Sequence, residues 1–182
     1  MPEATPFFTP LAGLAIVSLA ARPHLPLAET VERLFAITLP APGHSSETND
    51  LAFVSTSPNR WLAFSLHQNL YAHLLDPLAS LASVIDLTDS LSLLRLSGPG
   101  ARDVLQKGAP IDLHPRAMRA GMAASTLIAH ITVLIWQRYD APNSSYDIAC
   151  PSSYTASLRS WLAGAIDRPR PGDAVPWTPA RA

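Results

Sequence analysis

The amino-acid sequence predicts an α+β protein whose helices pack on one face of mainly antiparallel sheets. Short apolar runs rich in β-branched and aromatic residues alternate with stretches whose leucines recur at helical spacing. The order strand–helix–strand–strand–helix occurs over residues 11–81 and again over residues 91–163. A length of 182 residues, of which 48% are hydrophobic, suffices for two small lobes that share a core.

The first lobe is predicted to span residues 11–81. Leu70, Leu74 and Leu78 fall on one face of a helix, and residues 57–59 (Ser-Pro-Asn) form a turn between two strands. The expected strands are Leu14–Leu19, Leu51–Ser55 and Trp61–Ser65, and the expected helices are Glu29–Phe35 and Gln68–Leu81.

The second lobe is predicted to span residues 82–166. Its expected strands are Val84–Asp86, Leu91–Leu96, Thr126–Ala129, Ile131–Trp136 and Tyr146–Cys150, of which the third and fourth form one bent strand or two. Two helices are expected, at Pro99–Gln106 and Pro151–Ala163. Ser97 or Gly98 can cap the first of them and Gly108 ends it, whereas Ser152 or Ser153 can cap the second.

Prolines punctuate the chain, with 18 in the sequence, about twice the usual share. They cluster in residues 1–10 and 167–182, which are predicted to be extended tails, because proline lacks the N–H that a regular strand ladder uses. Residues 40–50 form the clearest internal loop. Trp177 lies in the C-terminal tail with no core beside it, so we expect it to anchor the tail on a partner.

Composition excludes several functional classes. Charged residues make up 15% of the chain and the formal net charge is −1, without a basic run, which argues against nucleic-acid binding. No apolar stretch is long enough to span a membrane, and the apolar segment 11–20 lacks the basic start of a signal peptide. The single cysteine, Cys150, cannot form an internal disulfide, which fits a cytoplasmic protein.

No catalytic, cofactor-binding or metal-binding residues are predicted in this chain. The six histidines lack the spacing of neighbouring metal ligands. Residues 97–100 (Ser-Gly-Pro-Gly) resemble a phosphate loop, but the Lys-Ser/Thr pair is missing and Pro99 removes a backbone donor, so a strand-to-helix turn is expected. Asp86 and Asp89 lie three apart, and the hydroxyl groups between them favour a hydrogen-bonded turn over acid–base chemistry.

The most distinctive polar cluster is Asp112-Leu113-His114-Pro115-Arg116. A histidine between an aspartate and an arginine could transfer a proton, but no nucleophile lies near it in the sequence. Pro110 and Pro115 bracket the loop, and Asp112 could pair with Arg116 across it. We therefore expect Asp112, His114 and Arg116 to serve as an interface or as a structural clamp.

Several runs together resemble a known family. They are residues 84–89 (Val-Ile-Asp-Leu-Thr-Asp), 94–99 (Leu-Arg-Leu-Ser-Gly-Pro), 101–105 (Ala-Arg-Asp-Val-Leu) and 111–116 (Ile-Asp-Leu-His-Pro-Arg). This set resembles the gamma subunit of heterotetrameric sarcosine oxidase. The stretch Asp-Leu-His-Pro-Arg is specific to that family, whereas the strand–Gly-Pro–helix part is shared with the folate-binding superfamily that includes the glycine-cleavage T protein.

The resemblance implies that this chain has part of the T-protein fold and that it is a non-catalytic structural subunit. The complex that it implies oxidatively demethylates sarcosine to glycine, with the chemistry in alpha, beta and delta subunits. By the same resemblance the flavins (FAD and FMN), NAD and tetrahydrofolate are held by the alpha and beta subunits, and the zinc by the delta subunit. The low share of charged residues agrees with a surface that partner chains cover.

Two alternatives remain open at this point. A stand-alone folate-binding or aminomethyltransferase-like one-carbon module would need a concave pocket with a carboxylate for the pterin ring. A scaffold of the same fold with a different oxidase partner would show the same sequence features.

Overall fold

The structure, a computed structural model, describes residues 5–140 and 144–167. In that part of the chain the strands form two five-stranded sheets, and all pairs of neighbouring strands are antiparallel. Sheet A has the order β1 (Phe7–Leu11), β7 (Leu91–Ser97), β10 (Ser145–Pro151), β9 (Ile131–Tyr139) and β8 (Ala123–Ile128). Sheet B has the order β3 (Ser45–Glu47), β4 (Leu51–Ser57), β5 (Arg60–Ser65), β2 (Ala15–Ala21) and β6 (Ala82–Asp86).

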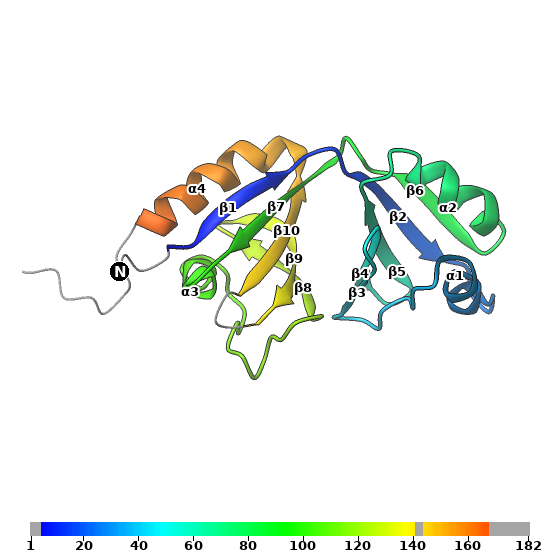
Figure 1. The fold of residues 1–182 in the computed structure, drawn as a ribbon, viewed down its shortest axis with the longest axis horizontal. Helices are drawn as coiled ribbons and strands as arrows, with labels where there is room; N and C mark the ends of the chain where they lie inside the picture. Colours follow the sequence, from blue (N-terminus) through cyan, green and yellow to red (C-terminus); the bar gives the residue numbers. More distant parts are fainter. Residues whose placement is uncertain (1–4, 141–143, 168–182) are drawn as a thin grey trace, which may run out of the picture.

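The helices lie on the outer faces of the two sheets (Figure 1). Helices α1 (Leu27–Phe35) and α2 (Leu70–Leu78) cover sheet B, whereas α3 (Ala101–Gln106) and α4 (Thr155–Asp167) cover sheet A. A 3₁₀ turn (Ser152–Tyr154) leads into α4. The predicted α+β class, with helices on one face of antiparallel sheets, is confirmed.

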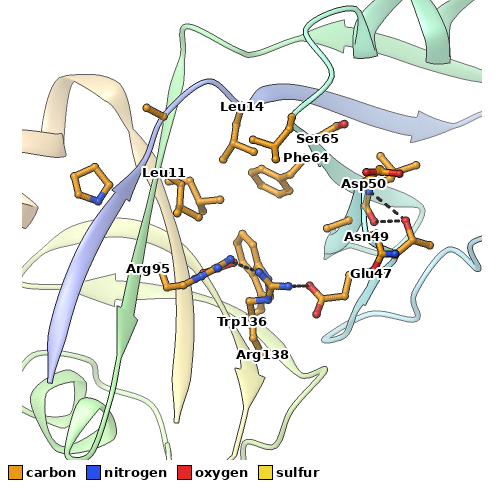
Figure 2. Close-up of a pocket in the computed structure, with 18 residues that line it drawn as sticks. Leu11, Leu14, Glu47, Asn49, Asp50, Phe64, Ser65, Arg95, Trp136 and Arg138 are labelled. Carbon is orange, nitrogen blue, oxygen red and sulfur yellow. Dashed lines mark hydrogen bonds and ion pairs between the residues drawn. The ribbon is translucent and has the colours of Figure 1, made fainter. Parts of the chain in front are cut away.

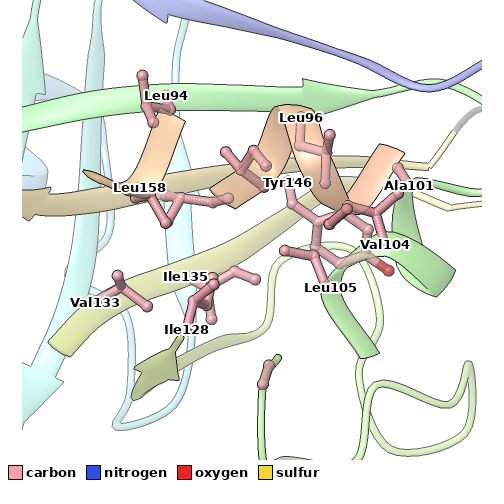
Figure 3. Close-up of a cluster of buried hydrophobic side chains, with 14 of the residues drawn as sticks. Leu94, Leu96, Ala101, Val104, Leu105, Ile128, Val133, Ile135, Tyr146 and Leu158 are labelled. Atoms are coloured by element: carbon pink, nitrogen blue, oxygen red, sulfur yellow. The ribbon is translucent and has the colours of Figure 1, made fainter. Parts of the chain in front are cut away.

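Three apolar clusters hold these layers together. One joins sheet A to α3 and α4, with Leu94, Leu96 and Tyr146 fully buried at its centre (Figure 3). A second joins sheet B to α1 and α2. The third lies between the inner faces of the sheets and includes Phe64 from sheet B and Trp136 from sheet A. The third cluster makes the two lobes one packed body, because strand side chains alternate between the two faces of each sheet.

Residues 7–11 differ from the prediction of a tail that avoids strand ladders. They form β1, which pairs with β7 from Phe7 opposite Ser97 to Leu11 opposite Leu93. Pro10 is tolerated because β1 is an edge strand of sheet A, where one row of backbone donors faces away from the sheet. Residues 1–4 and the predicted tail after residue 167 lie outside the described residues.

The sheets divide the chain differently from the expected lobes 11–81 and 82–166. Strand β1 comes first in the sequence but belongs to sheet A, and β6 begins at Ala82 but completes sheet B beside β2. The chain therefore crosses between the sheets twice, after Leu11 and after Asp86. Three-residue β3 lies inside the predicted loop 40–50, where its polar sequence gives no strand pattern.

The ends of the helices differ in detail from the prediction. Helix α3 begins at Ala101, and its N-cap is Gly100 with φ of 78° instead of Ser97 or Gly98; no side chain caps it. No serine caps the last helical segment either, because the Ser152 hydroxyl donates to the Asp89 carbonyl, 2.9 Å away. Of the two alternatives expected for residues 126–136, one bent strand or two, the structure shows two strands: β8 and β9 form a hairpin, whose turn residues Ala129 and His130 both have positive φ.

Gly108, the predicted stop of α3, has a packing role as well. A Cβ atom at this position would lie 2.3 Å from the ring of Trp161 on α4. The neighbouring Lys107 ammonium donates to the Ala165 carbonyl in the last turn of α4, where a cation interacts favourably with the helix dipole. These contacts fix the start of the loop that carries Asp112.

Candidate functional site between the two sheets

The loop predicted as an interface is exposed and rigidly anchored. Leu113 and Met118 are buried in the sheet A core, while Asp112, His114 and Arg116 point away from it as exposed residues. The buried side chains of Leu113 and Met118 anchor the loop to the core, so the backbone that carries the three polar side chains is fixed.

Local hydrogen bonds order these polar side chains. The His114 N–H donates to Asp112 Oδ1 at 2.8 Å, and the Arg116 N–H donates to His114 Nδ1 at 3.2 Å. Nδ1 of His114 therefore accepts a hydrogen bond, which assigns the ring proton to Nε2 in the neutral form. The expected pairing of Asp112 with Arg116 is wrong, because the structure records no ion pair between these two described side chains. Trp177 lies outside the described residues.

The other polar motifs are structural turns, as predicted. The Thr88 N–H donates to Asp86 Oδ1 at 2.9 Å, and hydrogen bonds from Thr88 lower the pKa of Asp86. Burial raises the pKa of the Cys150 thiol, which favours the inert neutral form. Gly98 and Gly100 have positive φ in the turn before α3.

A cavity of about 300 Å³ opens between the inner faces of the two sheets (Figure 2). Sheet B contributes Phe64, and sheet A contributes Trp136; their ring centroids are 5.1 Å apart. Leu11, the last residue of β1, and Leu14, in the crossing that follows, complete the apolar wall. The cavity is thus formed where two distant parts of the chain meet.

Charged side chains form the other wall of this cavity. Arg95 donates to the Asp147 carboxylate through Nε at 2.6 Å and through Nη2 at 2.9 Å. Arg138 lies 3.7 Å from the same carboxylate through Nη1, and its Nη2 lies 2.7 Å from Glu47 Oε2. The four side chains make a chain of alternating charge that links β7, β10 and β9 of sheet A to β3 of sheet B.

The antiparallel register explains this arrangement. Asp147 on β10 lies directly opposite Arg95 on β7 and opposite Trp136 on β9. Asp147 is 3% exposed, so its charge needs a partner inside the protein. The two-point hydrogen bond with Asp147 raises the pKa of Arg95 above its usual value, although burial opposes the shift.

Sequence reasoning missed Arg95, Arg138 and Asp147 as a site. The available signal was a charged residue inside an otherwise apolar strand, as in residues 91–97 (Leu-Ser-Leu-Leu-Arg-Leu-Ser). Such a residue points to a buried partner, but only the strand register identifies which one.

The described ranges show neither a metal-binding cluster nor a membrane-crossing helix. No group of three or more His, Cys, Asp or Glu side chains there has the arrangement to hold a metal ion. No helix in the same ranges has both the length and the apolar character needed to cross a membrane.

Two helix-covered sheets packed face to face define a class of fold that includes the glycine-cleavage aminomethyltransferase T. The crystal structure of that protein from Bartonella henselae matches with a TM-score of 0.66 at 17% identity, over 89% of this chain and 46% of that chain. At this identity the likeness concerns the fold alone. No protein-family model matches the chain.

Within this class the chain is similar to sarcosine oxidase gamma subunits, which confirms the resemblance predicted from the sequence. Over 83 residues it is 41% identical to the gamma subunit of Corynebacterium sp. (strain P-1) and 52% identical to that of Arthrobacter sp. Each match covers 46% of this chain and 39% of the relative, so less than half the length of these relatives is aligned. A chain of the heterotetrameric sarcosine oxidase from Corynebacterium sp. U-96, solved with pyrrole 2-carboxylate, matches with a TM-score of 0.81 at 28% identity, over 91% of this chain and 86% of that chain.

Proposed function

We propose that this chain is the non-catalytic gamma subunit of a heterotetrameric sarcosine oxidase, whose chemistry takes place in partner chains. The observation that carries the proposal is the match to a chain of such a heterotetramer over 91% of this chain and 86% of the other. The gamma-subunit matches over 83 residues support the same subunit type independently of the fold.

The proposal assigns the cofactors and the catalytic chemistry to the other subunits. Alpha, beta and delta subunits are the partners, and they hold FAD, FMN, NAD, tetrahydrofolate and zinc. We also propose a cytoplasmic location, in agreement with a single buried, unpaired Cys150.

Co-expression tests this function. The 182-residue chain, tagged, is produced together with candidate alpha, beta and delta chains. We expect the tagged chain to retain the other three through size-exclusion chromatography, and the complex to show flavin absorbance and sarcosine-dependent hydrogen peroxide formation. A permanent interface of this kind buries more than about 2,000 Å² in total, so the complex should survive dilution.

Two results would contradict the proposal. The tagged chain could elute alone, without flavin, when all four chains are present. Alternatively, the isolated chain could bind tetrahydrofolate saturably in calorimetry, which would favour the folate-binding module instead. Omitting one partner at a time serves as the control, because it identifies the subunit that contacts this chain.

We further propose that the exposed loop of Asp112, His114 and Arg116 contacts a partner subunit. Replacing Arg116 by glutamate should slow association by about threefold or more, because a charge at the edge of an interface acts mainly on the encounter rate. The buried anchors Leu113 and Met118 remain, so the fold should be unaffected. Association is measured by surface plasmon resonance against the complex that lacks this subunit.

The matched control for this variant is Arg159→Glu, which reverses an exposed charge on α4. Equal association rates for Arg116→Glu, Arg159→Glu and the unchanged chain would show that the loop faces solvent in the complex.

A further inference from the structure

The ionic wall of the inter-sheet cavity contains one replaceable contact. Asp147 is buried and receives two hydrogen bonds from Arg95, so its carboxylate is fixed. Arg138 is held at a longer distance from Asp147, 3.7 Å, and its short contact of 2.7 Å is with Glu47. A single carboxylate at Asp147 cannot neutralise two guanidinium groups, so Arg138 depends on Glu47 for its charge balance.

Glu47 is weakly held in this position. It belongs to β3, a three-residue strand at the edge of sheet B, and its side chain is 37% exposed. The Glu47 side chain is partly hydrated already, so it can move into water at small cost when another anion takes its place beside Arg138. Arg138 itself is more enclosed, with 21% of its side chain exposed.

Arg138 also carries an unused donor. Its Nε atom is buried and has no hydrogen-bond partner within the structure. An unsatisfied buried N–H is unfavourable, and in native proteins such a group calls for a specific explanation. A carboxylate that replaced Glu47 could accept hydrogen bonds from both Nε and one Nη of Arg138, which is the two-point geometry that guanidinium groups favour.

Most of the rest of the cavity wall is apolar. Phe64 and Trp136, whose rings contact each other, form part of it, and Leu93 and Leu51 line it as well. Figure 2 shows Arg95 and Arg138 on the side of the cavity nearest Trp136, with Phe64 and Leu14 above them. A ligand with a flat apolar body could contact these apolar side chains while its anionic end reaches Arg138.

We infer that this cavity binds a small monocarboxylate with a flat apolar body, whose carboxylate displaces Glu47 from Arg138. A single negative charge fits best, because Asp50 stands exposed at the rim and would repel a second carboxylate. A volume of about 300 Å³ limits the ligand to roughly a one- or two-ring compound. This site goes beyond the proposed role as a structural subunit and does not depend on it.

Benzoate is the probe for this inference, because it joins one carboxylate to a flat ring. Binding to the full-length chain is measured by ligand-observed NMR and by isothermal titration calorimetry, with benzyl alcohol and benzylamine as neutral and cationic comparators. We expect benzoate to bind at least about tenfold more tightly than either comparator, a difference equivalent to one charge-assisted hydrogen-bonded pair.

Two variants should change the affinity in opposite directions. Glu47→Gln removes the competing carboxylate, so benzoate should bind about threefold to tenfold more tightly. Arg138→Gln removes the guanidinium, so benzoate should bind at least about tenfold more weakly. Glu29→Gln, which alters an exposed carboxylate on α1, is the matched control and should leave the affinity unchanged.

The inference is overturned by either of two results. One is equal binding of benzoate and benzyl alcohol, and the other is an affinity in Glu47→Gln that equals or falls below that of the unchanged chain. The Glu47 variant decides the matter even if Arg138→Gln unfolds, because Glu47 is a half-exposed residue on an edge strand. Assembly with partner chains is a separate measurement, so the failure of one proposal leaves the other standing.

Discussion

Replacing Phe64 by alanine is expected to lower the free energy of unfolding by about 3–5 kcal/mol, the range found for buried phenylalanines. Phe64 is 4% exposed and packs against Trp136 with ring centroids 5.1 Å apart. It belongs to the cluster that joins the two sheets, so its loss removes apolar contact from both lobes at once. Urea unfolding of the full-length chain, followed by circular dichroism, measures the effect.

Phe53 provides the matched control for this prediction. It is fully buried on the neighbouring strand β4, but it faces α1 and α2 in the other sheet B cluster. Phe53→Ala should destabilise the chain by a similar amount, because it also removes a buried ring, but it leaves the contact between the two sheets in place. If Phe64→Ala lost less than about 1 kcal/mol, the inter-sheet cluster would not hold the lobes together.

Much of this architecture was predictable because the periodic signals were strong. The leucines at positions 70, 74 and 78 face one side at helical spacing, and the structure buries all three in α2. The apolar run at 91–96 predicted a strand, and β7 has partners on both sides within sheet A. The side chains that become buried determine whether such a segment forms a helix or a strand, and their spacing is visible in the sequence.

The elements that differed from the prediction lack that kind of signal. β1 contains Pro10, and local rules penalise proline without knowing that the strand will stand at an edge. β3 is three polar residues, which form a strand only because β4 lies beside them. In both cases a tertiary partner outweighs the local preference of the residues.

The site between the sheets was less predictable than the fold. Arg95 and Asp147 are 52 positions apart in the sequence and become neighbours only through the register of β7 and β10. The exposed loop of Asp112, His114 and Arg116 was visible in the sequence as a motif, because its residues are consecutive. Its internal hydrogen bonds were not, because Asp112 bonds the backbone of His114 instead of the Arg116 side chain.

Replacing Asp147 by asparagine is expected to lower the free energy of unfolding by about 2–3 kcal/mol. Removal of one partner from a buried ion pair costs about 3–5 kcal/mol when the remaining charge stays dry. Arg95 keeps 31% of its side chain exposed, so water can solvate part of the charge that is left, and the expected loss falls below that range. Urea unfolding at neutral pH measures it.

A second variant separates the charge from the packing in this cluster. In the double variant Asp147→Leu with Arg95→Met, both ionic partners become apolar and no unpaired charge remains beside Trp136. Replacement of a whole buried ion pair by apolar residues of similar volume is often neutral, so this variant should be closer in stability to the unchanged chain than Asp147→Asn is. Asp76→Asn on α2 removes an exposed carboxylate and should change stability by less than about 0.5 kcal/mol. If Asp147→Asn changed the free energy of unfolding as little as Asp76→Asn, the Asp147 carboxylate would be solvated. In that case its charge would not be balanced by Arg95 and Arg138, and Arg138 would not depend on Glu47.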